Sequence, residues 1–255
     1  MTVNTRRTDA TPLVEKARRL LRALHHTRRT KGAGASARLC ATLVAEILLR
    51  PITRRQDRLL DQRLGVGTER TTAEPVLDPR VAASAQHQDG VAYSPTPARQ
   101  LRKILRSLPI RTPSAFTFVD LGCGKGRTLL VAAEHGFGRA LGVEFDPELA
   151  DAARRNAAAY ELVAPACAGV IEVVQADAAR YEFPVEPVVV FLFNPFGEAT
   201  LRAVVDRIEE TLARWPRPFI VAYYNPMHSD VLDGSITLRA TLRNARWTVY
   251  AAGLQ

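Results

Sequence analysis

The stretch FVDLGCGKGR, residues 118–127, places three glycines at alternate positions directly after an apolar run that contains Asp120. An apolar run, a glycine turn and a helical segment in this order are typical of the first unit of a parallel α/β sheet. The turn lets the backbone approach a ligand closely, and the amides at the start of the next helix favour negative charge. We therefore expect a ligand-binding loop at Gly122, Gly124 and Gly126.

The spacing of the glycines bears on which ligand this loop binds. The dinucleotide pattern is G-x-G-x-x-G, and counting from Gly122 puts Arg127 where its third glycine would stand. The pattern here is D-x-G-x-G-x-G, with Asp120 two residues before the first glycine. A turn without a ligand is the simpler alternative, but each glycine would then cost about 0.5–1 kcal/mol relative to alanine. The pattern favours a cofactor other than a dinucleotide.

Short apolar runs alternate with helical segments from residue 97 onward. We expect strands at 116–121, 140–144, 170–175, 188–193 and 219–224, and helices at 97–108, 127–135, 147–159 and 198–214. Two shorter runs, 236–240 and 247–251, predict a closing antiparallel hairpin. The predicted fold is α/β, a Rossmann-like seven-stranded, mostly parallel sheet flanked by helices, with an N-terminal helical extension.

Positive charge is concentrated in the first quarter of the chain. Residues 1–60 carry 14 lysines and arginines against four acids, whereas residues 61–255 carry 21 against 22. A phosphate-binding arm is one explanation, and arginine-rich solvated helix faces are the simpler one. Helices are expected at 13–30 and 37–50, the second ending before Pro51. We predict a basic helical N-terminal cap at 1–60, a linker or loop at 61–90 and a catalytic domain at 91–255.

Composition excludes several other classes of protein. No run of 18 apolar residues is present, so no membrane span is expected. The three cysteines, Cys40, Cys123 and Cys167, form no C-x-x-C pair, which argues against a zinc site or a disulfide framework. No apolar segment follows Arg6 and Arg7, so a secretory signal is not indicated. We expect a cytoplasmic protein without a metal site.

At the glycine loop the sequence resembles the class I S-adenosylmethionine-dependent methyltransferases, and the resemblance covers residue 93 to the C-terminus. It implies that the loop passes under the methionine part of S-adenosyl-L-methionine, with Asp120 beside it. It also implies that Glu144, at the end of the second strand, holds both ribose hydroxyls, as a carboxylate can. An NAD-dependent enzyme would use the same acid in the same way.

Two further positions carry the resemblance to the cofactor site. Asp177 ends the third predicted strand, where the family's acid binds the adenine amino group, and the backbone amide of Ala178 would address the ring. An aspartate in this place is also a common helix cap. Together with the glycines and Glu144, Asp177 is assigned to the cofactor site.

The segment Asn194-Pro195-Phe196 follows a fully apolar predicted strand. It resembles the N/D-P-P-Y/F motif of amino methyltransferases, although it has one proline instead of two, and the Asn-x-Phe segment of Dot1-like lysine methyltransferases. The resemblance implies that Asn194 accepts a hydrogen bond from a target amino group beside the cofactor, and we include Asn194 among the cofactor contacts. A plain Asn-Pro turn is the alternative.

The predicted function is methyl transfer to a nucleophile, with nitrogen favoured. Tyr93 and Tyr223 are candidate catalytic residues with Asn194, and the candidate substrate-binding residues are Pro195, Phe196, Tyr224 and Asn225, ordinary packing being the alternative for the aromatics. The candidate methyl acceptors are a protein amino group, a small-molecule natural product, or RNA or DNA held by the basic arm. A cofactor-binding protein without activity, or an oxidoreductase on the related fold, also stays open.

Overall fold

The computed structural model describes residues 33–69, 94–167 and 169–253. The described residues belong to two compact units, one ending at Arg50 and the other beginning at Pro51. The helix predicted at 13–30 lies outside the described residues. The division into a cap at 1–60, a linker at 61–90 and a catalytic domain at 91–255 stays a prediction, although residues 51–69 belong to the same compact unit as the sheet.

In the described part of the chain, seven strands form one sheet in the order β3-β2-β1-β4-β5-β7-β6. Their bounds are β1 Thr117–Leu121, β2 Arg139–Glu144, β3 Ile171–Gln175, β4 Val188–Leu192, β5 Phe219–Tyr224, β6 Arg239–Arg243 and β7 Trp247–Ala252. Among the described strands, β7 runs opposite to the other six, which confirms the mostly parallel sheet and the closing hairpin. The first hairpin strand begins at Arg239, three residues later than predicted, with an irregularity in its pairing between Ala240 and Leu242.

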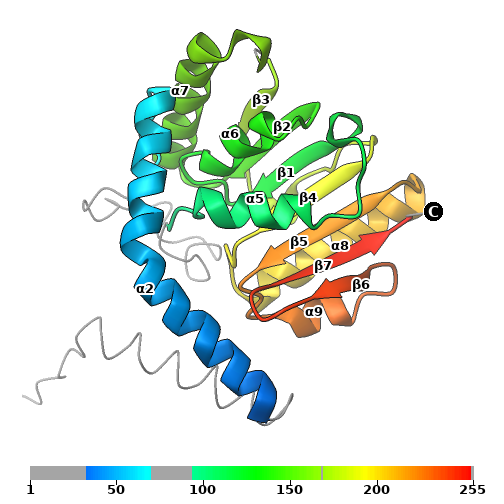
Figure 1. Cartoon of the computed structure of the whole chain (residues 1–255). Coiled ribbons are helices and arrows are strands. Elements are labelled where there is room, and N and C mark those ends of the chain that lie inside the picture. Colours follow the sequence, from blue (N-terminus) through cyan, green and yellow to red (C-terminus); the bar gives the residue numbers. More distant parts are fainter. Residues whose placement is uncertain (1–32, 70–93, 168, 254–255) are drawn as a thin grey trace, which may run out of the picture. The chain divides into compact units, whose positions relative to one another are not determined.

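Helices cover both faces of the sheet (Figure 1). On one face lie α5 Ala98–Arg106, α6 Arg127–Glu134 and α7 Pro147–Val163, and on the other α8 Glu198–Arg214 and the short α9 Ser229–Asp233. In β4, Val189 and Phe191 face the core under α5, α6 and α7, whereas Val190 and Leu192 face the core under α8 and α9. A parallel strand that is buried on both sides needs apolar residues at every position, so β4 reads as an unbroken apolar run.

The long helix α2 corrects one expectation. It runs from Ala33 to Leu64 and continues through Pro51, where we predicted its end. A proline inside a helix removes one backbone hydrogen bond and costs about 3 kcal/mol. Beyond it, Leu60 and Leu64 are buried in the core beside α5 and α6, and each such burial contributes roughly 1.5–3 kcal/mol. Tertiary packing therefore holds the second half of α2 helical. No helix among the described residues is both long and apolar enough to cross a membrane.

Candidate active site

The carboxyl ends of β1, β2, β4 and β5 meet at one edge of the sheet, where open α/β sheets bind their ligands. The glycine loop follows β1, and Gly122, Gly124 and Gly126 have φ of 84°, 54° and 80°. A Cβ on Gly122 would lie 2.6 Å from the Cβ of Pro195. The loop is therefore held in a left-handed backbone and in direct contact with the segment that follows β4.

Asp120 lies under this loop. Its carboxyl is buried and accepts a hydrogen bond from the Thr128 hydroxyl in the first turn of α6. Burial raises the pKa of Asp120 to about 7, the Thr128 hydrogen bond lowers it by less, and the nearby Glu144 charge raises it further. The side chain thus ties the end of β1 to the start of the helix behind the glycine loop.

Glu144 stands at the end of β2, next to the loop. Its Oε2 accepts the backbone N–H of Gly124 at 2.7 Å, and its Oε1 accepts that of Asp146 at 3.0 Å. Burial raises its pKa, and these amide hydrogen bonds lower it by less. Because the carboxylate binds the middle residue of the loop, it fixes the loop relative to β2. Asp146 in turn caps α7, which begins at Pro147.

Asp177 is brought to the same edge by β3. It is the N-cap of a short 3-10 helix, Ala178–Arg180, and its Oδ1 accepts the backbone N–H of Ala179 at 2.9 Å. The capping alternative is therefore realised in the structure. Its role in adenine binding, and that of the Ala178 amide, stay predictions.

Asn194 and Tyr223 come together from neighbouring strands. Asn194 has φ of 47°, a left-handed conformation that asparagine tolerates better than most residues. The Tyr223 hydroxyl donates to Asn194 Oδ1 at 3.2 Å, and the Asn194 amide nitrogen lies 3.2 Å from the sulfur of Met227. Burial raises the pKa of Tyr223, so its phenol keeps its proton at neutral pH and acts as a donor. The Asn194 side chain is thus fixed by two residues that follow or end β5.

The remaining candidate catalytic and substrate-binding residues do not gather around Asn194 in the described structure. Tyr93 lies outside the described residues. Phe196 is buried in the core under α8, and Tyr224 is buried in the opposite core, where its ring packs on Phe193 with centroids 4.7 Å apart. Asn225 has φ of 51° and its N–H donates to the carbonyl of Arg246. Their roles as substrate contacts stay predictions, and Pro195 is the one that contacts the glycine loop.

One cluster escaped the sequence prediction. Arg127, at the first position of α6, is buried and lies 2.9 Å from Asp57 and 3.7 Å from Asp61, both on α2. Its Nε also donates to the Thr68 hydroxyl. The cluster joins α2 to the residue that follows the glycine loop. The only signal in the sequence was the position of Arg127 directly after Gly126, because its partners are 59 to 70 residues away.

These residues fit S-adenosylmethionine as the bound cofactor. The loop is a close-approach backbone next to a buried acid, and each oxygen of a carboxylate can accept two hydrogen bonds, so Glu144 keeps acceptor capacity beyond its amide contacts. Among the described residues, no cluster of three or more histidine, cysteine, aspartate or glutamate side chains could hold a metal ion.

Residues 118–214 match the family model of a methyltransferase domain. Together with the sheet order and the glycine loop, this match shows that the chain contains a class I S-adenosylmethionine-dependent methyltransferase domain. The prediction of an S-adenosylmethionine-dependent methyltransferase domain is thereby confirmed for residues 118–214.

A curated relative is the ribosomal protein L11 methyltransferase of Dechloromonas aromatica (strain RCB), 31% identical over 146 residues. The match covers 54% of this chain and 46% of the relative, so the chain spans about half the length of the protein it matches. Similar solved structures include a Salinibacter ruber RNA methyltransferase in complex with S-adenosyl-L-homocysteine (22% identity, TM-score 0.40, 62% of this chain and 92% of that one). Another is the ribosomal protein L11 methylase of Lactobacillus delbrueckii subsp. bulgaricus (19%, TM-score 0.42, 71% and 89%).

Proposed function

We propose that this chain transfers the methyl group of S-adenosylmethionine to an amino nitrogen of a protein. The observation that carries the proposal is the contact between Gly122 and Pro195. A Cβ on Gly122 would come within 2.6 Å of Pro195, so the residue before that proline, Asn194, stands beside the cofactor loop. A side-chain amide oxygen in that place suits an N–H donor.

The geometry around Asn194 supports a role in positioning the acceptor. Its Oδ1 receives the Tyr223 hydroxyl at 3.2 Å, and the same oxygen has a second lone pair that can accept an N–H of an incoming amine. Tyr223 is itself held by the backbone N–H of His228, which donates to its hydroxyl oxygen at 3.4 Å. The acceptor would therefore meet an oxygen whose direction is already set by two strand ends.

Methyl transfer mainly requires that the amine nitrogen, the methyl carbon and the sulfur lie in line. Bound S-adenosylmethionine supplies a methyl carbon that is already electrophilic. The amine nitrogen forms a bond to that carbon, the carbon–sulfur bond breaks with its electron pair on sulfur, and the amine proton leaves to solvent. Holding the reacting atoms in line can lower the barrier by roughly 7–11 kcal/mol. Asn194 and Tyr223 would orient the amine, while Gly122, Gly124 and Glu144 would hold the cofactor.

The protein class of the acceptor rests on the name of the curated relative, a ribosomal protein L11 methyltransferase. The first acceptor to test is therefore ribosomal protein L11 from the same source as this chain. A small-molecule amine and RNA are the other two acceptor classes, and the same assay separates them.

The test uses S-adenosylmethionine labelled in its methyl group, the full-length enzyme and purified L11. Label that stays on the protein after treatment with base, and that appears in methylated lysine or in the α-amino group on amino acid analysis, supports the proposal. Label released by base as methanol would mean a methyl ester and would refute nitrogen as the target. Label in RNA but not in L11 would refute the protein acceptor.

A variant separates acceptor binding from cofactor binding. Asn194→Ala should lower methyl transfer at least tenfold while changing the affinity for S-adenosylmethionine by less than twofold, since about 1.4 kcal/mol of orientation corresponds to a factor of ten. Calorimetry measures the affinity of both proteins. Equal losses in turnover and in affinity would assign Asn194 to the cofactor instead.

A further inference from the structure

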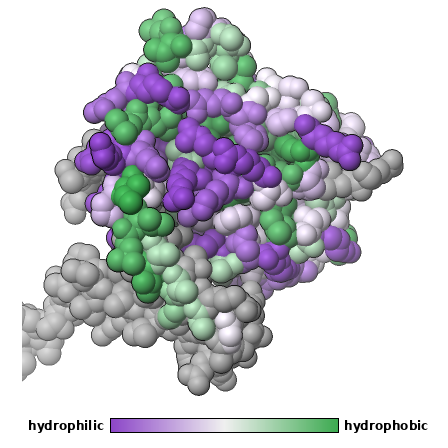
Figure 2. All heavy atoms as spheres, viewed as in Figure 1, coloured by the Kyte–Doolittle hydropathy of each residue, from purple (hydrophilic) through white to green (hydrophobic). Residues whose placement is uncertain are grey.

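Two neighbouring helices, α5 and residues 51–64 of α2, carry a dense set of cations, and the described acid that pairs with them is Glu134, which binds Arg63 and Arg102. The eight side chains are Arg54, Arg55, Arg58 and Arg63 on α2 and Arg99, Arg102, Lys103 and Arg106 on α5, and all but the half-buried Arg102 are exposed. We call this set the arginine surface. Figure 2 shows hydrophilic side chains gathered across the middle of the face on which α5 lies.

Glu134 pairs with Arg63 and Arg102, and the rest of the charge of this surface is uncompensated because of how the helices pack. The only acids of α2 in this region, Asp57 and Asp61, are buried and directed to Arg127. Asp57 also accepts the backbone N–H of Ala98 at 3.1 Å, which holds the start of α5 against α2. No acid occurs in α5 itself. The unit that begins at Pro51 therefore carries a locally positive surface, although residues 61–255 have a net charge near zero.

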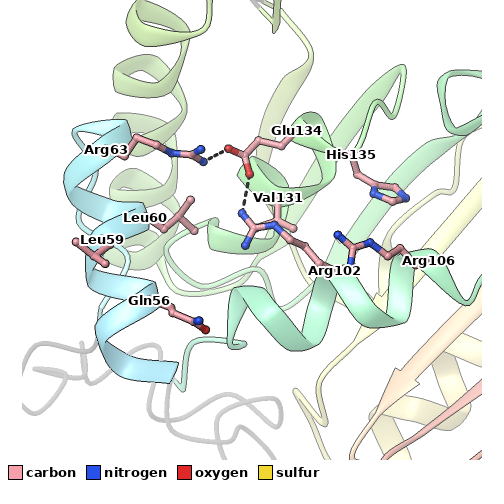
Figure 3. Close-up of a pocket in the computed structure, with 9 residues that line it drawn as sticks. All are labelled: Gln56, Leu59, Leu60, Arg63, Arg102, Arg106, Val131, Glu134 and His135. Atoms are coloured by element: carbon pink, nitrogen blue, oxygen red, sulfur yellow. Dashed lines mark hydrogen bonds and ion pairs between the residues drawn. The ribbon is translucent and has the colours of Figure 1, made fainter. Parts of the chain in front are cut away.

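A groove of about 760 Å³ lies within this surface. Its lining comes from α2, α5, α6 and the residue after α6, and consists of Gln56, Leu59, Leu60, Arg63, Arg102, Arg106, Val131, Glu134 and His135 (Figure 3). Glu134 binds both Arg63 and Arg102, the latter at 2.8 Å. Arg106 forms no ion pair with any residue that the structure describes, and burial, followed by the charge of Arg106, lowers the pKa of His135. The groove thus has a positive end at Arg106 that no carboxylate balances.

We propose that the arginine surface binds a single strand of nucleic acid through its phosphates. Seven of its eight cations are arginines, whose planar fork matches a phosphate better than lysine does. Arg99, Arg102 and Arg106 lie on successive turns of α5, spaced by about 4.5 and 6 Å along the axis. The groove lining contains no phenylalanine, tyrosine or tryptophan on which bases would stack, so the contacts are to the backbone and independent of base sequence.

This surface is separate from Asn194 and Tyr223, the residues proposed to orient the acceptor. Asn194 and Tyr223 stand at the ends of β4 and β5, whereas the arginine surface covers the outside of α2 and α5. The inference holds whether or not the methyl acceptor is a protein. The start of α5 is nevertheless linked to the glycine loop, because Asp57 accepts the N–H of Ala98 and also pairs with Arg127.

The test measures binding of a fluorescent single-stranded oligouridylate to the full-length chain by anisotropy. Each phosphate contact on a single strand adds about −0.7 to the slope of log affinity against log salt. With about four contacts, the dissociation constant should rise roughly fifty-fold between about 50 and 200 mM salt. An oligothymidylate of equal length should bind with similar affinity and slope, because both strands present the same phosphates.

A matched pair of variants locates the binding. The first combines Arg99→Gln, Lys103→Gln and Arg106→Gln, which leaves the Glu134 ion pairs of Arg63 and Arg102 intact. The second combines Arg155→Gln and Arg214→Gln at exposed positions with Arg207→Gln at a half-buried position on α8, and removes the same charge elsewhere. The first should make the slope shallower by about 2, and the second should leave it unchanged.

Three results would overturn the proposal. Equal effects of the two variants would mean that binding follows net charge and not this surface. Polyglutamate competing as well as the oligonucleotide at equal charge would mean a docking site for an acidic protein. A dissociation constant that does not change with salt would exclude phosphate contacts. Thermal unfolding of both variants, expected within 2–4 °C of wild type for changes under about 1 kcal/mol, controls for folding.

Discussion

Replacing Asp120 with asparagine is expected to flatten the dependence of stability on pH. Burial raises the pKa of this carboxyl from 3.8 to about 7 in the folded protein, the Thr128 hydrogen bond lowers it by less, and Glu144 raises it. Because the folded-state pKa is raised above the unfolded value, its contribution to stability is complete below about pH 4 and is lost as pH rises through about 7. Asparagine keeps an acceptor for the Thr128 hydroxyl and has no charge to bury.

The size of the effect follows from the shift. One pKa unit corresponds to 1.36 kcal/mol, and about two units lie between pH 5 and the folded-state pKa. Between about pH 5 and pH 8 the wild type should therefore lose roughly 2.5 kcal/mol of unfolding free energy that the Asp120→Asn variant keeps. The other titrating groups contribute nearly equally to both proteins and largely cancel in the comparison.

Urea unfolding followed by circular dichroism at the two pH values measures this difference. Asp206→Asn, at an exposed position on α8, is the matched control, because it removes the same charge without a buried carboxyl, and its profile should follow that of the wild type. If the Asp120→Asn and wild-type free energies change in parallel from about pH 5 to pH 8, the carboxyl is not titrating in this range and the reasoning fails.

Gly122→Ala should lower the unfolding free energy by about 1–3 kcal/mol more than Gly136→Ala in thermal or urea unfolding. Both glycines have positive φ (84° and 92°), but of the two only Gly122 faces Pro195. Equal losses would contradict the close contact. Arg127→Met should lower the unfolding free energy by about 3–5 kcal/mol in urea titrations, since it leaves the buried carboxylates of Asp57 and Asp61 without their cation. A loss under about 1 kcal/mol would show that the cluster does not contribute to stability. Tyr223→Phe should reduce turnover up to about tenfold at unchanged cofactor affinity, and an equal fall in both would refute its role in orienting the acceptor.

Much of the fold could be predicted because local signals agreed with the final packing. The apolar run at 188–192 needed no alternation, since both faces of β4 are covered, and the helix at 198–214 has the predicted bounds. The hairpin strand β6 was misplaced because its residues are mostly exposed and show little periodicity. The end of α2 was misplaced because the burial of Leu60 and Leu64, which a local reading of Pro51 does not see, outweighs the proline.

Some residues of the site could also be predicted from the sequence, and others could not. Residues at or just after the ends of strands, such as Glu144 and Asn194, could be predicted, because parallel strands bring their carboxyl ends to one edge. The contact of Pro195 with Gly122 could not, since a glycine pattern does not name what approaches it. The Arg127 cluster could not be predicted because Asp57 lies in the segment interpreted as a basic cap and Asp61 in the segment interpreted as a linker.

The most direct test of the cofactor site is calorimetric titration of S-adenosylmethionine into the wild type, Glu144→Ala and Glu148→Ala, with NAD⁺ as a competing ligand. Glu148 is an exposed acid on α7 and serves as the control. We expect one bound S-adenosylmethionine per chain and no displacement by NAD⁺. Binding to Glu144→Ala should be at least tenfold weaker, because about 1.5 kcal/mol of hydrogen bonding is lost. Binding to Glu148→Ala should be unchanged. Wild-type affinity in a folded Glu144→Ala variant, or displacement by NAD⁺, would contradict the site.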